Sequence, residues 1–211
     1  MKKILVVDDQ RIHREYMEEV IKNRGKYELL PSLTDAETAV SMCRQRHVDM
    51  VLMDIHTGGR FDGIEASELI LKEHPEVLIL IVTSMIDSDY LTRAKEAGAA
   101  GLWYKDESPE RLADVIDRIF AGEKIFPGEP PVVRIGAISS DELTPAEVKV
   151  LRLIVEGYEY DEIAEDLGLK LSTVKWHVSN ILHKTGFPNR TRLAVAVSQK
   201  KFIVPSSVEL E

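Results

Sequence analysis

Short apolar runs alternate with amphipathic stretches along the first 120 residues. The apolar runs are rich in Val, Ile and Leu and end at polar residues, which is typical of strands buried in a parallel sheet. They predict strands at about 3–8, 27–32, 49–54, 77–83 and 101–104. Apolar positions at helical spacing predict helices at about 11–24, 35–46, 62–74, 88–97 and 109–120. This alternation predicts a doubly wound α/β domain with a five-stranded parallel sheet.

The periodicity ends near Ala121 and resumes near Leu143. Glycine and proline accumulate between these points, which predicts a linker without regular structure. Thr144-Pro145 then supplies an N-cap and a first-turn proline. Further helices are predicted at about 145–156, 160–167, 172–185 and 190–200. We therefore expect an α/β domain, a linker, a small all-helical domain and a tail, at residues 1–121, 122–141, 142–204 and 205–211.

Length and composition limit the class of protein. The 211 residues suffice for two domains that each bury a core. The longest nearly unbroken apolar stretch, Val77–Val82, is far shorter than the ~20 residues that cross a bilayer. Asp8 and Asp9 interrupt the N-terminal apolar run too early for a signal peptide. We expect a cytoplasmic protein without a membrane partner. Its single cysteine, Cys43, lies in a predicted helix and is expected to have a packing role.

Charge is distributed unevenly along the chain. The net charge of −9 argues at first against a nucleic-acid partner. Between Ser172 and Phe202, however, there are six lysines and arginines and no acidic residue. A local excess of this kind is expected of a surface that contacts phosphates.

Three carboxylates stand where the apolar runs of predicted strands end: Asp8 and Asp9 at the first, and Asp54 at the third. Ligands collect at the carboxyl ends of parallel strands, so these acids are expected to meet in one pocket. Clustered carboxylates repel unless a cation neutralises them, and oxygen ligands suit Mg2+. A single aspartate after a strand is more often a turn former or a helix cap. Thr83 and Lys105 also follow strands, and the five residues together favour a functional site.

With these five residues in these positions, residues 1–121 resemble the receiver domain of a two-component response regulator, which has a flavodoxin-like fold. The resemblance implies that Asp54 accepts a phosphoryl group from a cognate histidine kinase. Lys105 then pairs with one phosphoryl oxygen, and Thr83 moves inward to donate a hydrogen bond to another. An aspartate carboxylate is a competent nucleophile for such a step. The implied Mg2+ ligands are Asp9, Asp54, Asp8 partly through water, and the backbone carbonyl of His56.

The receiver-like domain departs from the usual pattern in two places. Many receivers have Met-Pro where this chain has Thr57-Gly58, and the loop from Asp54 to Gly63 is one residue longer than usual. The position of the aromatic switch residue holds Leu102. These departures leave the metal and nucleophile residues intact, but they weaken the expectation of the usual coupling between the threonine and the aromatic ring.

The second domain resembles the LuxR-type helix-turn-helix of the NarL/FixJ response regulators. The resemblance rests on Leu143 to Glu147, Glu162-Ile163-Ala164, Leu167-Gly168-Leu169 and Thr173 to Ile181. It implies binding to double-stranded promoter DNA as a homodimer. The final helix, around Leu193 to Val197, forms the dimer contact in the family. The alternative is that this helix only closes the domain core.

The helix at 172–185 is expected to read DNA. Helical spacing turns Val174, Val178, Ile181 and Leu182 toward the core. By resemblance, Lys175, Trp176 and Ser179 take the base-reading positions. Trp176 offers apolar contact to thymine methyl groups or to the DNA backbone, unless it covers part of the helical core. The expected phosphate contacts are Lys175, His177, His183, Lys184, Arg190 and Arg192.

These observations favour a phosphorylation-dependent transcriptional regulator that is not an enzyme. One alternative is an atypical regulator whose receiver acts without phosphorylation as a dimerisation or ligand module. Another is an aspartate-dependent phosphatase, but Asp8-Asp9 lacks the second aspartate that such enzymes carry two residues after the nucleophile.

Overall fold

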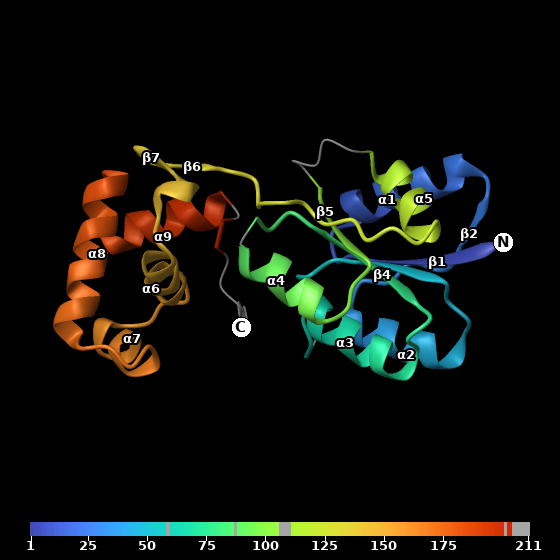
Figure 1. Cartoon of the computed structure of the whole chain (residues 1–211), viewed down its shortest axis with the longest axis horizontal. Coiled ribbons are helices and arrows are strands. Elements are labelled where there is room, and N and C mark those ends of the chain that lie inside the picture. The colour runs from blue at the N-terminus through green and yellow to red at the C-terminus, as the bar shows by residue number, and fades with distance from the viewer. Residues whose placement is uncertain (58–59, 87, 106–110, 201, 204–211) are drawn as a thin grey trace. The chain divides into compact units, whose positions relative to one another are not determined.

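A computed structural model of the chain describes residues 1–57, 60–86, 88–105, 111–200 and 202–203 (Figure 1). Gly58 and Gly59 of the loop between Asp54 and Gly63, the first residues of the helix predicted at 109–120 and the tail predicted at 205–211 lie outside these residues. The chain divides into two compact units. The first contains Met1–Ser84 and Ser88–Pro130, and almost all of the second follows Pro130.

The first unit is built on a parallel sheet. Among the described residues, five strands pair in the order β2-β1-β3-β4-β5. Their bounds are Lys2–Val7 (β1), Tyr27–Leu29 (β2), Met50–Met53 (β3), Leu78–Thr83 (β4) and Gly101–Tyr104 (β5). The registers Val7 to Met53 and Thr83 to Tyr104 align the strand ends. The predicted doubly wound sheet is confirmed, and its polar strand ends meet at one edge.

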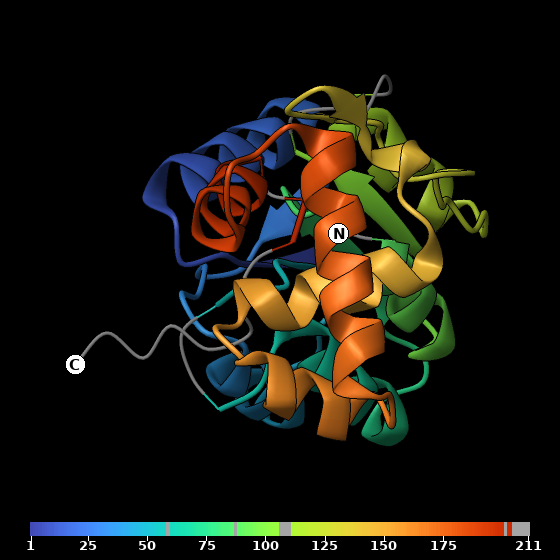
Figure 2. The same ribbon diagram turned by 90° about the vertical axis from the view of Figure 1, so that its left-hand side faces the viewer.

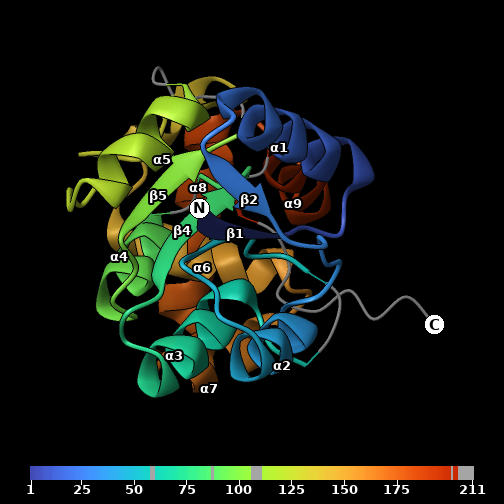
Figure 3. The ribbon, with the colours of Figure 1, turned by 90° about the vertical axis from the view of Figure 1, so that its right-hand side faces the viewer.

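Helices cover both faces of this sheet. Their bounds are Arg11–Arg24 (α1), Ala36–Gln45 (α2), Gly63–Glu73 (α3), Ser88–Glu96 (α4) and Leu112–Phe120 (α5). Helices α1 and α5 lie on one face, and α2, α3 and α4 lie on the other (Figures 1 and 3). Buried strand residues such as Leu52 and Leu80 pack against α1 and α5 residues such as Met17 and Ile116. This core fixes the strand ends on which the polar residues stand.

Strand β2 is shorter than predicted. It ends at Leu29, whereas the pattern predicts a strand to residue 32. The backbone still bonds to β1 further along, because Leu30 N–H donates to Ile4 O and Leu33 N–H to Val6 O. In a regular ladder Ser32 would be the next donor after Leu30, so the pairing with β1 is out of step at Pro31-Ser32.

The beginning of the predicted linker is fixed to the sheet. Ile125 N–H donates to Ala100 O at 3.0 Å, and Leu102 N–H donates to Ile125 O at 2.9 Å. A Cβ on Gly101 would lie 2.6 Å from Ile125 O, so this approach requires glycine. The segment thereby covers the edge of β5, and the expectation of an unstructured linker is wrong here.

The second unit begins with a small hairpin, which also lies inside the predicted linker. Strands β6 (Arg134–Ile135) and β7 (Ile138–Ser139) pair antiparallel and bury their isoleucines. At the turn, Ala137 N–H donates to Thr185 O at 2.9 Å. Gly136 has φ 62° and no room for a Cβ, which would lie 2.1 Å from the same oxygen. The hairpin therefore belongs to the helical unit, and the linker prediction is wrong for this segment too.

Helices form the rest of the second unit. A 3-10 turn, η1 (Ser140–Glu142), precedes α6 (Pro145–Val155), α7 (Tyr160–Asp166), α8 (Leu171–Thr185) and α9 (Arg190–Gln199). The predicted capping box of α6 is present, since Glu147 N–H donates to Thr144 Oγ1 and Thr144 N–H to Glu147 Oε2. Helix α8, orange in Figure 2, packs across α6 and α7. Within the described part of the chain, no helix is long and apolar enough to cross a membrane.

The hairpin leads to a prediction about the boundary of the second unit. A fragment that begins at Val132 is expected to be more stable than one that begins at Glu142, by roughly 2 kcal/mol, because the shorter fragment loses two buried isoleucines. Urea unfolding of the two fragments measures the difference. Equal midpoints would show that the hairpin contributes nothing to the helical core.

Candidate metal centre and nucleic-acid interface

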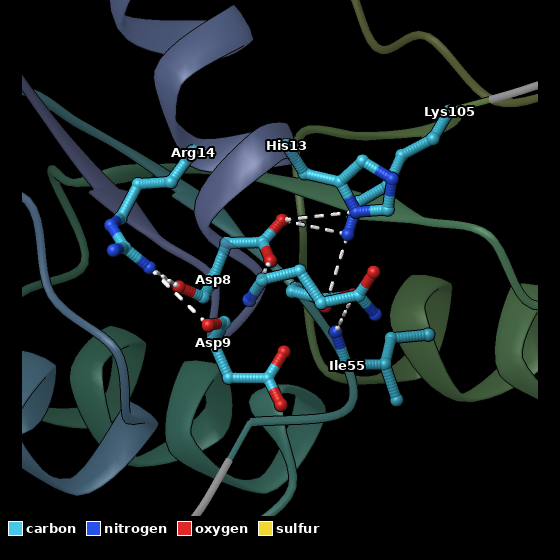
Figure 4. Close-up of polar contacts among 8 residues, drawn as sticks. Asp8, Asp9, His13, Arg14, Ile55 and Lys105 are labelled. Carbon is cyan, nitrogen blue, oxygen red and sulfur yellow. Dashed lines mark hydrogen bonds and ion pairs between the residues drawn. The ribbon is translucent and has the colours of Figure 1, made fainter.

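Three carboxylates meet at the carboxyl edge of the sheet (Figure 4). Asp8 and Asp9 follow β1, and Asp54 follows β3, whose last residue pairs with Val7. One oxygen from each side chain lies within 4.8 Å of the others. Asp54 is 3% exposed and Asp8 is fully buried, whereas Asp9 is open to solvent. The structure thus brings together the three acids that the sequence placed at strand ends.

Lys105 bridges the two buried acids. Its Nζ lies 2.7 Å from Asp8 Oδ2 and 3.0 Å from Asp54 Oδ2, and its side chain is 6% exposed. The register of β5 on β4 carries it there, because Tyr104 pairs with Thr83. Thr83, the last residue of β4, is also fully buried. A buried cation therefore stands between the two carboxylates.

Backbone donors hold the acids in place. Ile55 N–H donates to Asp54 Oδ1 at 2.9 Å, and Gln10 N–H donates to Asp8 Oδ1 at 2.9 Å. From α1, Arg14 Nη1 donates to Asp8 O at 2.7 Å (Figure 4). The sequence pattern does not point to Arg14, because only the fold brings α1 back over the strand end.

Burial raises the pKa of Asp54 to about 7, the negative charge of Asp8 adds to this, and the positive charge of Lys105 opposes it. Three carboxylates and one lysine leave the pocket with excess negative charge. A hard divalent cation with oxygen ligands suits this donor set. Asp9, exposed at the edge of the pocket, and the oxygens of Asp54 and Asp8 fit such an ion.

The raised pKa of Asp54 predicts how the stability of the receiver unit depends on pH. The pKa of Asp54 is higher in the folded chain, about 7, than its ordinary value of 3.8. The unfolded chain therefore loses this proton first, and stability falls as the pH rises through this window. Asp54→Asn cannot titrate, so without Mg2+ the variant should gain on the order of 2 kcal/mol over wild type between about pH 5 and pH 8. Urea unfolding with a chelator tests this, and a constant gap at both pH values would contradict it.

His56 lies just beyond the acids. Its Nε2 is 3.1 Å from the hydroxyl oxygen of Tyr90 in α4, and burial lowers the pKa of the imidazole. Thr57, at the first of the unusual loop positions, accepts a hydrogen bond at Oγ1 from Ala36 N–H, at the start of α2. This threonine therefore has a structural role that a methionine could not provide.

Gly63 is a further residue of the site that its position in the sequence does not reveal. A Cβ at this position would lie 1.9 Å from Asp54 O and 2.8 Å from Asp54 C. Gly63 N–H also donates to Ile55 O at 2.8 Å. The first residue of α3 thus packs directly on the backbone of Asp54. The sequence signal was Asp62-Gly63 at a helix start, where a glycine is otherwise unexpected.

In the second unit, α8 presents an exposed polar face. Lys175, Ser179 and His183 are exposed, whereas Val174, Val178 and Ile181 are buried and Leu182 is half-buried. The side chain of Trp176 is 60% exposed. The alternative that Trp176 covers the helical core is therefore wrong. Its indole instead stacks edge-on against His177, with ring centroids 4.9 Å apart.

Two of the expected phosphate contacts are engaged within the domain. Lys184 Nζ lies 2.8 Å from Glu147 Oε2, whose side chain is buried. Arg190 pairs with Glu159, and its guanidinium lies 5.0 Å from the centre of the Tyr160 ring. Glu147 and Glu159 lie before the basic stretch between Ser172 and Phe202, yet they neutralise two of its positive charges. A count of charges within the stretch alone therefore overstates the positive charge of this surface.

Lys184 and Arg192 are both basic residues of the same stretch, but the ion pair with Glu147 gives Lys184 a structural role that Arg192 does not have. Lys184→Ala leaves Glu147 buried without its cation and is expected to destabilise the domain by about 1–2 kcal/mol. Arg192→Ala, at an exposed position, is expected to leave stability unchanged and to reduce the salt dependence of DNA binding by about one ion. Urea unfolding and DNA titrations at several salt concentrations measure both. A loss of stability in Arg192→Ala together with unchanged stability in Lys184→Ala would contradict this prediction.

Helix α9 has one buried and one exposed apolar side. Leu193 and Val197 are buried in the domain core, whereas Val195 is 51% exposed. A cleft of about 270 Å³ adjoins it, lined by Val155, Tyr158 and Ala194 among others. Closing the core alone does not account for this exposed side.

Comparisons with known proteins match both units. Residues 4–117 match the response regulator receiver domain, and residues 141–197 match the luxR family of bacterial regulatory proteins. The response regulator protein VraR of Staphylococcus aureus is 30% identical over 208 residues, which cover 95% of this chain and 98% of VraR.

Solved structures show the same folds. RcsB from Salmonella enterica serovar Typhimurium, bound to promoter P1flhDC in the presence of the phosphomimetic BeF3−, matches with a TM-score of 0.63 and 20% identity, over 93% of this chain and 98% of RcsB. A structure of two RcsB dimers bound to two parallel DNAs matches with a TM-score of 0.61 and 21% identity, over 93% and 98%. A LuxR-family two-component response regulator from Aurantimonas matches with a TM-score of 0.55 and 34% identity, over 58% and 87%.

Proposed function

The chain belongs to the two-component response regulators with a LuxR-type DNA-binding domain, and from this we propose that it binds promoter DNA under the control of phosphorylation at Asp54. The observation that carries the proposal is the pocket in which Asp8, Asp9 and Asp54 lie within 4.8 Å of one another. Lys105 completes it, 3.0 Å from the proposed nucleophile. The family consists of transcription regulators rather than enzymes.

The proposed reaction is phosphoryl transfer from a phosphohistidine of a cognate kinase. Oδ2 of the Asp54 carboxylate, which Lys105 contacts, forms a bond to phosphorus as the bond to the imidazole nitrogen breaks, and the imidazole leaves with the electron pair and takes up a proton. Ile55 N–H holds the other oxygen, Oδ1, and so orients the carboxylate. Bound Mg2+ would supply the positive charge that neutralises the transferred group.

The remaining pocket residues hold the charges. Asp8, Asp9, Asp54 and the backbone carbonyl of His56 would bind Mg2+. Lys105 would move its contact from Asp54 to a phosphoryl oxygen. Thr83, fully buried at the end of β4, would donate its hydroxyl to another oxygen. The inward movement of Thr83 would favour one of two states of the surface formed by α4, β5 and α5.

The proposed output is binding to two promoter half-sites by a homodimer in the cytoplasm. Helix α8 would enter the major groove, with Lys175, Trp176 and Ser179 toward the bases. The exposed side of α9, around Val195, would meet the second copy. The proposed phosphate contacts are His183, Lys184, Arg190 and Arg192. Lys184 and Arg190 would first have to leave their acidic partners, Glu147 and Glu159.

The test is phosphorylation of the intact protein by a small phosphodonor such as acetyl phosphate. With Mg2+, the mass should increase by one phosphoryl group, and with a chelator it should not. A mass that never changes, with a donor that labels a known receiver in parallel, would overturn the proposal.

A second candidate is a regulator whose receiver acts without phosphorylation as a dimerisation or ligand module. Leu102 motivates it, because this buried side chain has no hydroxyl or ring to follow Thr83. Complete phosphorylation without any change in DNA affinity would favour this candidate.

A further inference from the structure

Helix α4 contacts both ends of the chain segment between Asp54 and Gly63. The first contact is with His56, near the start of this segment. The hydroxyl of Tyr90 lies 3.1 Å from His56 Nε2, and the two rings meet edge to face with centroids 5.8 Å apart. Tyr90 is buried. His56 is only two residues from Asp54, and its backbone carbonyl is a proposed metal ligand. The position of this carbonyl therefore depends in part on a side chain from α4.

The same helix contacts the far end of that segment. Arg93 Nη2 lies 2.6 Å from Asp62 Oδ2, and the guanidinium lies 5.8 Å from the centre of the Tyr90 ring. Asp62 is the N-cap of α3, and its Oδ1 accepts hydrogen bonds from Ile64 and Glu65 N–H. In Figures 1 and 3, α4 lies beside α3. Arg93 thus joins α4 to the first turn of α3.

The far end is in turn fixed to the proposed nucleophile. Gly63 follows Asp62, and its N–H donates to Ile55 O at 2.8 Å. Its Cα packs against Asp54 O so closely that no Cβ would fit. The start of α3 cannot shift without displacing the backbone of Asp54. A displacement of α4 would therefore act on the site through both His56 and Asp62.

We propose that Tyr90 and Arg93 are positioning residues for the phosphoryl-transfer site, and that they couple its occupancy to the position of α4. The proposal rests on the proposed function of that site. In many receivers an aromatic ring couples the phosphorylated site to the surface of the domain, and Leu102 occupies the position of that ring. The proposal assigns this coupling to α4. Coupling is reciprocal, so anything that binds the site better with α4 in one position also favours that position.

Three variants test the proposal in the full-length protein. Tyr90→Phe removes only the hydroxyl, and Arg93→Gln removes the ion pair with Asp62. Arg44→Gln is the control, because Arg44 joins α2 to Glu73 at the other end of α3 by an ion pair away from the pocket. Mg2+ affinity is measured by isothermal titration, and hydrogen exchange of α4 amides is measured with and without Mg2+ and the beryllofluoride phosphoryl analogue.

The expected result is a loss of Mg2+ affinity of roughly 5- to 10-fold in Tyr90→Phe and Arg93→Gln and none in Arg44→Gln. Wild-type α4 should exchange at a different rate when the site is occupied, and this change should shrink in both test variants. Wild-type affinity and an undiminished exchange response in both variants would overturn the proposal, even if both are less stable. A wild-type protein that binds no Mg2+ and accepts no phosphoryl group would instead overturn the proposed function, and this inference with it.

Discussion

Asp54→Asn is expected to abolish phosphoryl labelling, with an initial rate lower by on the order of 10³-fold or more. Asparagine keeps the size and the hydrogen bond from Ile55 N–H but lacks a nucleophilic carboxylate oxygen. The measurement is intact-protein mass after incubation with Mg2+ and a small phosphodonor. The variant should still fold, because it removes a charge that burial opposes.

Asp49→Asn provides the control for this prediction. Asp49 precedes β3 at the opposite edge of the sheet and pairs with Lys2 at 2.7 Å. Its substitution should leave labelling at the wild-type rate. Equal labelling of wild type and Asp54→Asn would place the phosphoryl group on another residue and remove the basis of the proposed switch.

Gly63→Ala is expected to destabilise the receiver unit by about 3 kcal/mol or more. The atoms that its Cβ would meet, Asp54 O at 1.9 Å and Asp54 C at 2.8 Å, are backbone atoms of the central strand end. They cannot rotate away as a side chain can, so either α3 or the Asp54 backbone must shift. The same shift should weaken Mg2+ binding, because it displaces a proposed ligand.

Gly128→Ala is the matched substitution for Gly63→Ala. A Cβ there meets nothing within 4 Å, so the change should be within about 0.5 kcal/mol. Urea unfolding of the two variants and wild type measures both effects. A small and equal effect at Gly63 would show that the loop after Asp54 adapts freely, and the transmission from α4 to Asp54 would lose its structural basis.

The sheet and the pocket were predictable because their signals are local. Buried parallel strands are apolar along their whole length, and their carboxyl ends meet at one edge whatever the lengths of the intervening helices. Asp8, Asp54, Thr83 and Lys105 could therefore be placed together before any distance was known. The exposed face of α8 followed in the same way from helical spacing.

The contacts that the sequence did not predict are made by residues far apart in the chain. Ile135 and Ile138 are too few to produce a periodic signal, so the sequence pattern does not distinguish the hairpin from a linker. Lys184 pairs with Glu147, 37 positions away, and only the packing of α8 on α6 brings them together. Tyr90 and Arg93 show no pattern that points to His56 or Asp62. Such pairs depend on tertiary packing, which local spacing does not encode.

The central claim is that phosphorylation of Asp54 controls DNA binding by α8. It is tested most directly by the affinity of the full-length protein for duplexes selected from a random DNA pool, measured at fixed salt before and after complete phosphorylation. The account predicts that affinity rises by about 10-fold or more in wild type and stays constant in Asp54→Asn. Equal affinity of the phosphorylated and unphosphorylated wild-type protein would contradict it.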